Sequence, residues 1–334
     1  MHDFWVAAAQ FEARDRDKAH NFARIADLSF RAARAGAAAV LFHECCVTGY
    51  TFLQTLRREE LLDLAEPVPD GLTTRQLGEL AREASITILA GLLEREQDPK
   101  TGELRIYNTC VAVSPGGFLA RHRKLHPFVS PHLSAGSAYT MFDLGGIRAG
   151  ILICYDNNLP ENVRMTTLLG AEVIFMPHVT CGTPSPVPGR GVIAREVWDN
   201  RARDPARCRE EFHGPKGRQW LMKWLPARAF ENGVYAVFSN AIGIDHDTVK
   251  TGGAMVIDPY GDVVAESNEL EEDVVLALCT AEKIERSGGR RYLRARRPEL
   301  YAKLAEALPR GQGPVTEPGW RLERPPDAPG AAPA

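Results

Sequence analysis

The chain has 334 residues, of which 44% are hydrophobic and 25% are charged, and its formal net charge is -3 at pH 7. This length suits one large domain or two small ones and is enough to bury a sizeable core. The slightly acidic charge gives no attraction to nucleic acid, and no apolar run is long enough to cross a bilayer, so we expect neither as a partner.

The cysteines indicate a reducing compartment. Their odd number and irregular spacing argue against a disulfide framework, and no Cys-x-x-Cys pair suggests a metal site. Residues 1–5 lack the basic and apolar regions of a signal peptide, so we expect a cytoplasmic protein with free thiols. The seven cysteines are Cys45, Cys46, Cys110, Cys154, Cys181, Cys208 and Cys279.

The first part of the chain alternates buried strands with amphipathic helices. Apolar runs of β-forming residues predict the strands, and apolar side chains at helical spacing predict the helices. Thr73 or Thr74 is expected to cap the second helix. This alternation is typical of an α/β protein. The expected strands are Phe4–Gln10, 37–42 and 86–93, and the expected helices are 18–35 and 73–84.

The middle of the chain has a different pattern. Three short strands are joined by turns rich in Pro and Gly, which favours antiparallel pairing. A strand, a helix and another strand then predict a βαβ-like unit. The three short strands are expected at 105–113, 118–122 and 141–144, and the unit at 147–154, 161–169 and 172–176.

Residues 182–217 are rich in Pro and Arg and predict an irregular insertion. We expect a surface excursion, since loops usually lie at the surface; a lid over the site or a subunit contact is the alternative. The main domain is expected to span 1–309, followed by a disordered Pro/Gly-rich tail at 310–334. The other expected strands are 234–240, 253–258, 262–265 and 274–279, and the other expected helices are 219–231 and 298–308.

The expected strands divide into two groups, each accompanied by a few helices. The sequence has no internal repeat and no linker that splits its body. Two sheets packed face to face, with helices on the outside, fit this division. We therefore predict an α/β fold arranged as a four-layer α-β-β-α sandwich.

The strand expected at 147–154 ends in Cys154, and a polar turn and a helix follow it. A core strand seldom ends in Cys-Tyr-Asp-Asn-Asn unless the turn lies at a sheet edge, where α/β proteins bind ligands. Backbone N–H groups and the positive end of a helix at such a turn are expected to lower the pKa of a thiol. We predict that Cys154 is a nucleophile; a buried structural cysteine is the alternative.

Two other strands end in residues that suit the same chemistry. Glu44 follows the strand at 37–42, and a carboxylate at the tip of a buried strand is costly to desolvate unless it is paired or used. Lys124 follows the strand at 118–122, inside a basic run. A carboxylate can remove the thiol proton, and an ammonium can stabilise the oxyanion that forms after attack. Each residue alone is equally consistent with a solvated strand end.

Together these motifs resemble the nitrilase superfamily of carbon–nitrogen hydrolases over about residues 4 to 280. The matching stretches are 42–50, 123–126 and 152–161. The resemblance implies an αββα sandwich in which Glu44 is the general base, Lys124 supports the tetrahedral intermediate and Cys154 attacks. It also implies a thioester intermediate, no metal or organic cofactor, and a homodimer formed through the helices that flank the sheets, often within a larger homo-oligomer.

The chain departs from the family pattern between the lysine and the cysteine. Many relatives carry a second glutamate there, but residues 128–150 contain no Glu, and Asp143 in an expected strand is their only acidic residue. His132 is the nearest polar candidate for a substitute. A loop histidine exposed to solvent is the alternative, because histidine is usually only partly buried.

The residues after the nucleophile narrow the substrate. Cys-Tyr-Asp looks more like amidases and carbamoyl-amide hydrolases than like nitrilases, and Asn157 and Asn158 stand where carboxylate-recognising carbamoylases often carry Arg. We therefore expect a small linear amide or N-carbamoyl substrate that is neutral or carries an amine. Tyr50, Tyr155 and His178 lie just past strand ends and are the further candidate substrate contacts.

The leading hypothesis is a hydrolase that cleaves the C–N bond of such a small molecule and releases ammonia or an amine. A true nitrilase and a non-catalytic metabolite-binding relative are the alternatives. The complete set of Glu44, Lys124 and Cys154 argues against the binding protein, which has no need for all three. The arginines between 286 and 297 are expected to form a solvated helix or a subunit contact rather than an anion site.

Overall fold

The computed structural model describes residues 2–185 and 187–306 and is built on two six-stranded sheets. The order of the first sheet is β14 (Asp273–Cys279), β1 (Phe4–Gln10), β2 (Ala39–Leu41), β3 (Thr87–Gln97), β4 (Leu104–Ser114) and β5 (Gly117–Arg123). β1, β2 and β3 run parallel, as helical crossovers require, and β3, β4 and β5 form an antiparallel meander.

The second sheet repeats this plan. Its order is β13 (Val263–Glu266), β12 (Met255–Ile257), β9 (Tyr235–Asn240), β8 (Val173–His178), β7 (Arg148–Ile151) and β6 (Thr140–Asp143). β7, β8 and β9 run parallel, and the outer strands pair antiparallel with them. The strand expected at 147–154 corresponds to β7 and is shorter than expected. It ends at Ile151, three residues before Cys154.

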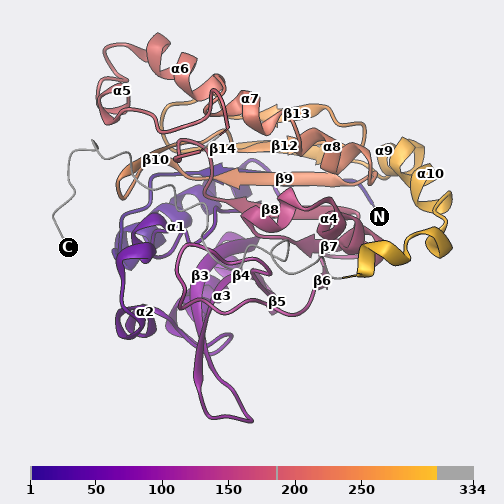
Figure 1. Ribbon diagram of the computed structural model, residues 1–334, viewed down its shortest axis with the longest axis horizontal. Helices are drawn as coiled ribbons and strands as arrows, with labels where there is room; N and C mark the ends of the chain where they lie inside the picture. The colour runs from indigo at the N-terminus through magenta and orange to yellow at the C-terminus, as the bar shows by residue number, and fades with distance from the viewer. Residues whose placement is uncertain (1, 186, 307–334) are drawn as a thin grey trace.

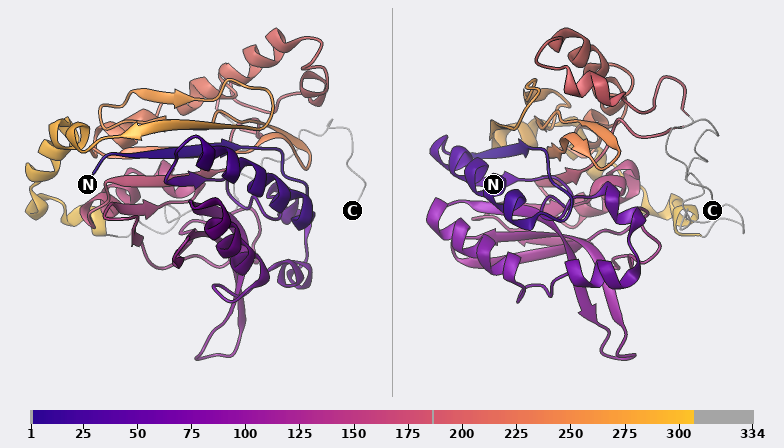
Figure 2. Two further views of the ribbon diagram at one scale, coloured as in Figure 1. Left: turned by 180° about the vertical axis from the view of Figure 1, so that it is seen from behind. Right: turned by 90° about the vertical axis from the view of Figure 1, so that its left-hand side faces the viewer.

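Helices cover the outer face of each sheet (Figures 1 and 2). α1 (Lys18–Arg34) and α3 (Leu72–Ala84) bury Ile25, Leu28 and Leu77 against the first sheet. α4 (Pro160–Leu168), α7 (Arg218–Leu221) and α8 (Leu225–Phe230) cover the second sheet in the same way. The predicted four-layer α-β-β-α sandwich is confirmed.

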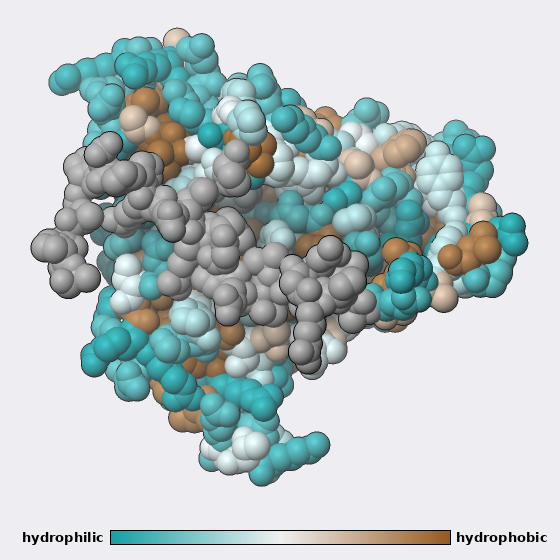
Figure 3. All heavy atoms as spheres, in the orientation of Figure 1, coloured by the Kyte–Doolittle hydropathy of each residue, from teal (hydrophilic) through white to brown (hydrophobic). Residues whose placement is uncertain are grey.

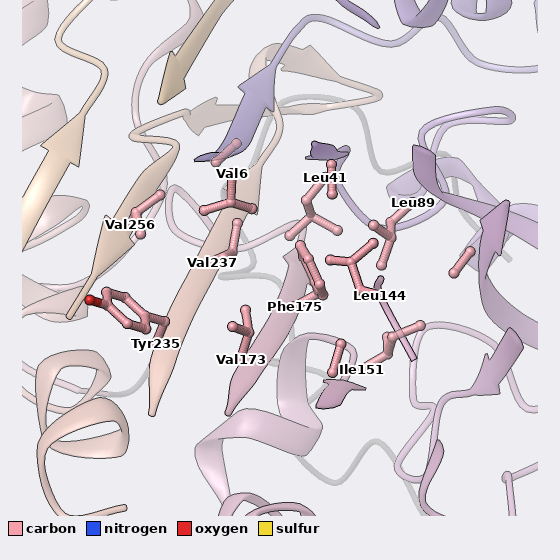
Figure 4. Packing of buried hydrophobic residues seen from close by; sticks show 14 of the residues in the cluster. Val6, Leu41, Leu89, Leu144, Ile151, Val173, Phe175, Tyr235, Val237 and Val256 are labelled. Atoms are coloured by element: carbon pink, nitrogen blue, oxygen red, sulfur yellow. The ribbon is translucent and has the colours of Figure 1, made fainter. Parts of the chain in front are cut away.

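The core lies between the two sheets, and Figure 4 shows side chains from both sheets pointing toward one another. Val6, Leu41 and Leu89 come from the first sheet, and Phe175 and Val237 come from the second; all five are fully buried. Each such side chain contributes about 1.5–3 kcal/mol by leaving water. This contact holds the two halves of the chain in one fixed relation, on which a site built from both sheets depends.

The segment expected to be an irregular insertion is partly helical. It contains α5 (Arg195–Asp199) and α6 (Pro205–His213), which lie at one corner of the molecule beside a hairpin (Figure 1). That hairpin is β10 (Ile242–Asp245) and β11 (Thr248–Thr251), which the sequence analysis missed. A small apolar cluster joins them, and its members include Val197, Trp198, Phe212, Ile242 and Val249.

Several other elements differ from expectation. Neither Thr73 nor Thr74 caps α3, which begins after Gly71; the Thr73 N–H and hydroxyl both donate to Glu66, at 2.7 Å each. The helix expected at 219–231 is divided into α7 and α8, with Pro226 in the first turn of α8, where proline is tolerated. The short helices not predicted are η1 (Thr51–Thr55), α2 (Arg58–Leu64), α9 (Ala281–Arg286) and α10 (Gly288–Arg294).

The last described residues form two short 3-10 turns, η3 (Pro298–Leu300) and η4 (Ala302–Ala305), where one helix was expected. The predicted disordered tail at 310–334 lies outside the described residues. Within the described chain, no helix combines the length and the apolar character that crossing a membrane would need.

The tip between β3 and β4 projects from the body, and Figure 3 shows that its surface is mainly hydrophilic.

Candidate active site

Three strand ends deliver the residues that the sequence singled out. Glu44 lies just beyond β2, Lys124 directly follows β5, and Cys154 begins the 3-10 helix η2 (Cys154–Asn158) after β7. All three side chains are buried, with exposures of 1%, 1% and 5%. Two glycines allow the backbone segments around these residues to pack closely together. A Cβ on Gly91 would lie 2.3 Å from the Cys45 nitrogen, and one on Gly136 would lie 2.2 Å from the Arg123 carbonyl oxygen.

A buried ion pair forms the centre of the site. Lys124 Nζ donates to Glu44 Oε1 at 2.6 Å, and Asn108 Nδ2 donates to the same oxygen at 2.6 Å. The other carboxylate oxygen, Glu44 Oε2, has no hydrogen-bond partner among residues 2–185 and 187–306. A buried acceptor left unsatisfied is costly, so Oε2 is the oxygen that is available to accept a proton.

Cys154 completes this group. Burial raises the pKa of the Cys154 thiol, the charge of Glu44 raises it further, and the charge of Lys124 opposes both. This corrects the expectation that the turn would lower that pKa. The resting group is therefore a neutral thiol, which requires a base before it can attack. Its backbone is in the left-handed region, with φ at 48°, and Sγ lies 4.0 Å from the Val179 carbonyl oxygen.

Lys124 is held in its charged form. Burial would lower the pKa of Lys124, but the charges of Glu44, Tyr50 and Cys154 outweigh it, and the pKa stays well above the usual range. Its ammonium lies 4.7 Å from the ring centroid of Phe128 and 5.3 Å from that of Tyr50. Aromatic faces stabilise a desolvated cation, so this ammonium suits a developing negative charge beside it.

Asp156 ties the lysine segment to the nucleophile turn. Its buried carboxylate accepts from the backbone N–H groups of Leu125, His126 and Ile153, at 3.2, 2.9 and 3.1 Å. His122 Nε2 lies 3.3 Å from the same carboxylate. Asp156 thus fixes residues on both sides of the site at once. From the sequence, Asp156 was noted only as part of a motif, although a carboxylate in the turn after a buried strand was a signal for its role.

The four other candidates are placed differently from one another. Tyr50 is buried, and its hydroxyl oxygen accepts from Lys124 Nζ at 3.4 Å. Tyr155 is partly buried and meets the Phe128 ring edge-on at 5.7 Å. His132 is not brought to the buried group: its side chain is exposed, and its backbone N–H donates to Ser130 Oγ at 3.4 Å.

His178 is buried at the end of β8. Its Nε2 accepts from Asn157 Nδ2 at 3.1 Å, which places the ring proton on Nδ1. In the described chain that Nδ1 has no hydrogen-bond partner. Burial and the nearby charge of Lys124 hold the pKa of His178 well below its usual value, so the ring is neutral. The structure therefore offers a neutral donor, Nδ1–H, beside the lysine.

A family model described as carbon-nitrogen hydrolase matches residues 5–287. The chain belongs to the carbon-nitrogen hydrolase family. The family resemblance noted from the three motifs is thereby confirmed, and the matched range includes both sheets and all three buried residues.

Two relatives and one solved structure are similar to this chain. An (R)-stereoselective amidase of Pseudomonas sp. is 31% identical over 82% of this chain and 84% of its own. A nitrilase of Pyrococcus abyssi is 29% identical over 81% of this chain and 88% of its own. The amidase structure from Nesterenkonia AN1, of the nitrilase superfamily, has a TM-score of 0.64 and 22% identity, covering 90% of this chain and 97% of that one. At that identity the likeness shows the shared fold.

Proposed function

We propose that this carbon-nitrogen hydrolase cleaves the C–N bond of a small linear amide or N-carbamoyl compound through a thioester on Cys154. The observation that carries the proposal is the buried Lys124–Glu44 contact of 2.6 Å, whose charges both act on the Cys154 thiol. The Cys-Tyr-Asp turn and the relative named as an amidase favour an amide over a nitrile.

The first half of the reaction forms the acyl-enzyme. Glu44 accepts the thiol proton while Sγ bonds to the amide carbon, and the carbonyl electron pair moves onto oxygen. The Lys124 ammonium and the Tyr155 N–H stabilise that oxyanion. The oxyanion then collapses, Glu44 gives its proton to the nitrogen, the C–N bond breaks, and ammonia or an amine leaves. No charge is left without a partner in this step. The negative charge moves from Glu44 to the oxyanion, and the Lys124 ammonium pairs with each in turn.

The second half releases the acid. Glu44 accepts a proton from a water molecule as the water oxygen bonds to the thioester carbon. The new oxyanion is held by the same donors. Collapse breaks the C–S bond, and the proton returns from Glu44 to sulfur, so the enzyme ends as it began. Glu44 thus acts twice as base and twice as acid, which a single carboxylate held by Lys124 and Asn108 can do.

We assign the nearby side chains to substrate binding. Tyr50 and Tyr155 lie against the Lys124 and Phe128 group, and the free Nδ1–H of His178 suits a carbonyl or other acceptor. His132 is left out of this proposal, because its side chain is exposed whereas the central three are buried. Asn108 replaces it as the residue that shares the Glu44 carboxylate with lysine.

A panel of amides, N-carbamoyl compounds and nitriles, read by ammonia release, tests the proposal. We expect amide or carbamoyl turnover that Cys154→Ala abolishes and Cys208→Ala, a buried thiol in α6, leaves unchanged. Turnover of nitriles alone would favour the nitrilase alternative, for which the Pyrococcus relative's name is the supporting observation. Turnover retained in Cys154→Ala would contradict the mechanism.

We further propose one catalytic domain over residues 1–309, a cytoplasmic location and a homodimer or larger homo-oligomer. β1, the first strand, pairs with β14, the last strand of the described chain, and all seven cysteines are free thiols, as in a reducing compartment. α4 and its C-cap residue present three large apolar side chains to the surface, and light scattering after gel filtration tests whether they meet a second copy. These are Met165, Leu168 and Leu169.

A further inference from the structure

A second buried lysine lies near the site and takes no part in the mechanism above. Lys250 is on β11, and its side chain is 1% exposed. In the hairpin it pairs with Gly243, two residues from the pair Asp245–Thr248, so Lys250 and Asp245 belong to one face. The other face, with Ile242 and Val249, packs on the insertion helices. Lys250 therefore points away from the insertion.

Asp245 does not satisfy this ammonium. The Asp245 Oδ1 atom already accepts from the Tyr50 and Thr51 N–H groups, at 3.4 and 3.1 Å. Its Oδ2 accepts from the Thr51 hydroxyl. Lys250 Nζ lies 3.8 Å from Oδ2, too far for a hydrogen bond, and among the described residues it makes none. An ammonium carries three donors, and burying them unused is costly.

Two connections link the hairpin that carries Lys250 to the candidate active site. Asp245 binds the backbone of Tyr50, whose hydroxyl lies 3.4 Å from Lys124 Nζ. On the other side, the segment that begins at Val179, beside Cys154 Sγ, packs on β11. A Cβ on Gly182 would lie 1.8 Å from the Val249 carbonyl oxygen.

The charges agree with this placement. Burial lowers the pKa of Lys250, and the charges of Asp245, Cys181 and Cys154 oppose that effect, so the ammonium and the nucleophile influence each other. Arg190 adds a second cation. Its guanidinium lies 3.8 Å from the Trp220 ring centroid, and the charges of both Arg190 and Lys250 act on the Cys181 thiol. Arg190 has no carboxylate partner within the described part of the chain.

We propose that Lys250 binds a carboxylate of the substrate, so that the favoured substrates are amides which also carry a carboxylate, such as monoamides of dicarboxylic acids. This inference rests on the proposed hydrolysis at Cys154. It replaces the expectation of a neutral or amine-bearing substrate, which depended on Asn157 and Asn158. The Asn157 amide is engaged with the Leu152 carbonyl oxygen at 2.7 Å and with His178, so it says nothing about the substrate.

The test compares the monoamides of succinic, glutaric and adipic acids with the matching neutral diamides. For wild type, kcat/KM for the best monoamide exceeds that for its diamide by at least about tenfold, the scale of a charge-assisted hydrogen bond. Lys250→Met lowers kcat/KM for the monoamide by about 10–100-fold, mainly through KM, and changes the diamide by less than about threefold. Lys250→Arg retains part of the preference because the charge remains.

Three results would overturn the assignment. These are no wild-type preference for monoamides, an equal loss on monoamide and diamide in Lys250→Met, and full recovery of both substrates in the double variant Lys250→Met, Asp245→Asn. The last two would mean that Lys250 only balances Asp245. The wild-type comparison needs no variant and holds even if Lys250→Met fails to fold.

A binding measurement separates this inference from the proposed function. Calorimetric titration of the Cys154→Ala variant with glutaric acid monoamide requires no turnover. Binding that disappears in the Cys154→Ala, Lys250→Met double variant supports the carboxylate site even if no amide is hydrolysed. Absence of binding in Cys154→Ala, with wild type hydrolysing neutral amides, overturns the carboxylate site and leaves the hydrolase intact.

Discussion

Lys124 Nζ lies 2.6 Å from Glu44 Oε1, and both side chains are completely buried. The two residues are separated by 80 positions in the chain; Glu44 follows the central strand β2 of the first sheet and Lys124 follows its edge strand β5. Their pairing offsets the cost of burying two charged groups at a place where water is excluded. The Cys154 thiol, delivered by the second sheet, meets this pair, so the sandwich itself assembles the reactive group.

Removing the base is expected to slow the chemical step. Glu44→Gln keeps the shape of the side chain but cannot accept the thiol proton, so we expect kcat to fall by at least about 100-fold. It also leaves the Lys124 charge buried without its partner, which costs about 3–5 kcal/mol of stability. Steady-state kinetics and urea unfolding measure the two effects. Glu59→Gln, the same change at an exposed position, is the control and should alter neither.

Asp156 is predicted to position both halves of the site. Asp156→Asn replaces an acceptor by a group with two donors, which face backbone N–H groups that also donate. We expect kcat to fall by at least about tenfold with KM changed by less than about threefold, and a loss of about 1–3 kcal/mol in stability. Asp143→Asn, in β6, is the matched control. A change in Asp156→Asn confined to the unfolding midpoint would assign this residue to stability alone.

The buried histidines predict how stability depends on pH. Burial lowers the pKa of His43 to about 3, and burial with the charge of Lys124 holds the pKa of His178 well below its usual value. An unfolded histidine takes up a proton near pH ~6.5, so below that pH the unfolded state binds more protons than the folded state. The contribution of these two histidines to stability is therefore constant above about pH 6.5 and falls as pH decreases, by about 1.4 kcal/mol per pH unit for each histidine.

Urea unfolding at about pH 7 and about pH 5 measures this loss. His43→Asn should remove about half of it, whereas His213→Gln, at an exposed position in α6, should remove none. An equal free energy of unfolding at the two pH values would contradict the buried, neutral state of both rings. A steeper loss would point to additional groups.

The contact between the two sheets predicts an effect on the free energy of unfolding. Leu89 is fully buried on β3 against the second sheet, and Leu89→Ala leaves a cavity there. We expect a cost of about 2–5 kcal/mol. Leu104→Ala, at an exposed position on β4, should cost no more than about 0.5 kcal/mol. A small effect of Leu89→Ala, measured by urea unfolding, would mean that the sheets do not depend on this contact.

The strongly patterned elements were predictable. β1 has its predicted bounds, and α1 ends one residue before its predicted end, because long apolar runs and helical spacing are local signals. The hairpin of β10 and β11 was missed because its strands have four residues each and carry Gly243 and Lys250 where an apolar residue would mark a strand. The helices α5 and α6 were missed because charged residues hide their few buried positions.

The site residues divide in the same way, into those marked by local sequence signals and those defined only by the folded structure. Glu44, Lys124 and Cys154 were found from strand ends and motif order, which are properties of sequence. Asn108 and Lys250 were not, because their roles depend on pairings across strands that sequence alone does not define. The expected lowering of the thiol pKa was wrong for a related reason: burial and the Glu44 charge raise it, and both depend on the assembled sandwich.

Mass spectrometry of the peptide that carries Cys154, after rapid quenching during turnover of an amide substrate, tests the central claim most directly. The account predicts an adduct on Cys154 with the mass of the substrate minus ammonia or the amine, which disappears as the substrate is consumed. Turnover without any adduct on this peptide, or an adduct on a different residue that persists in Cys154→Ala, would contradict it.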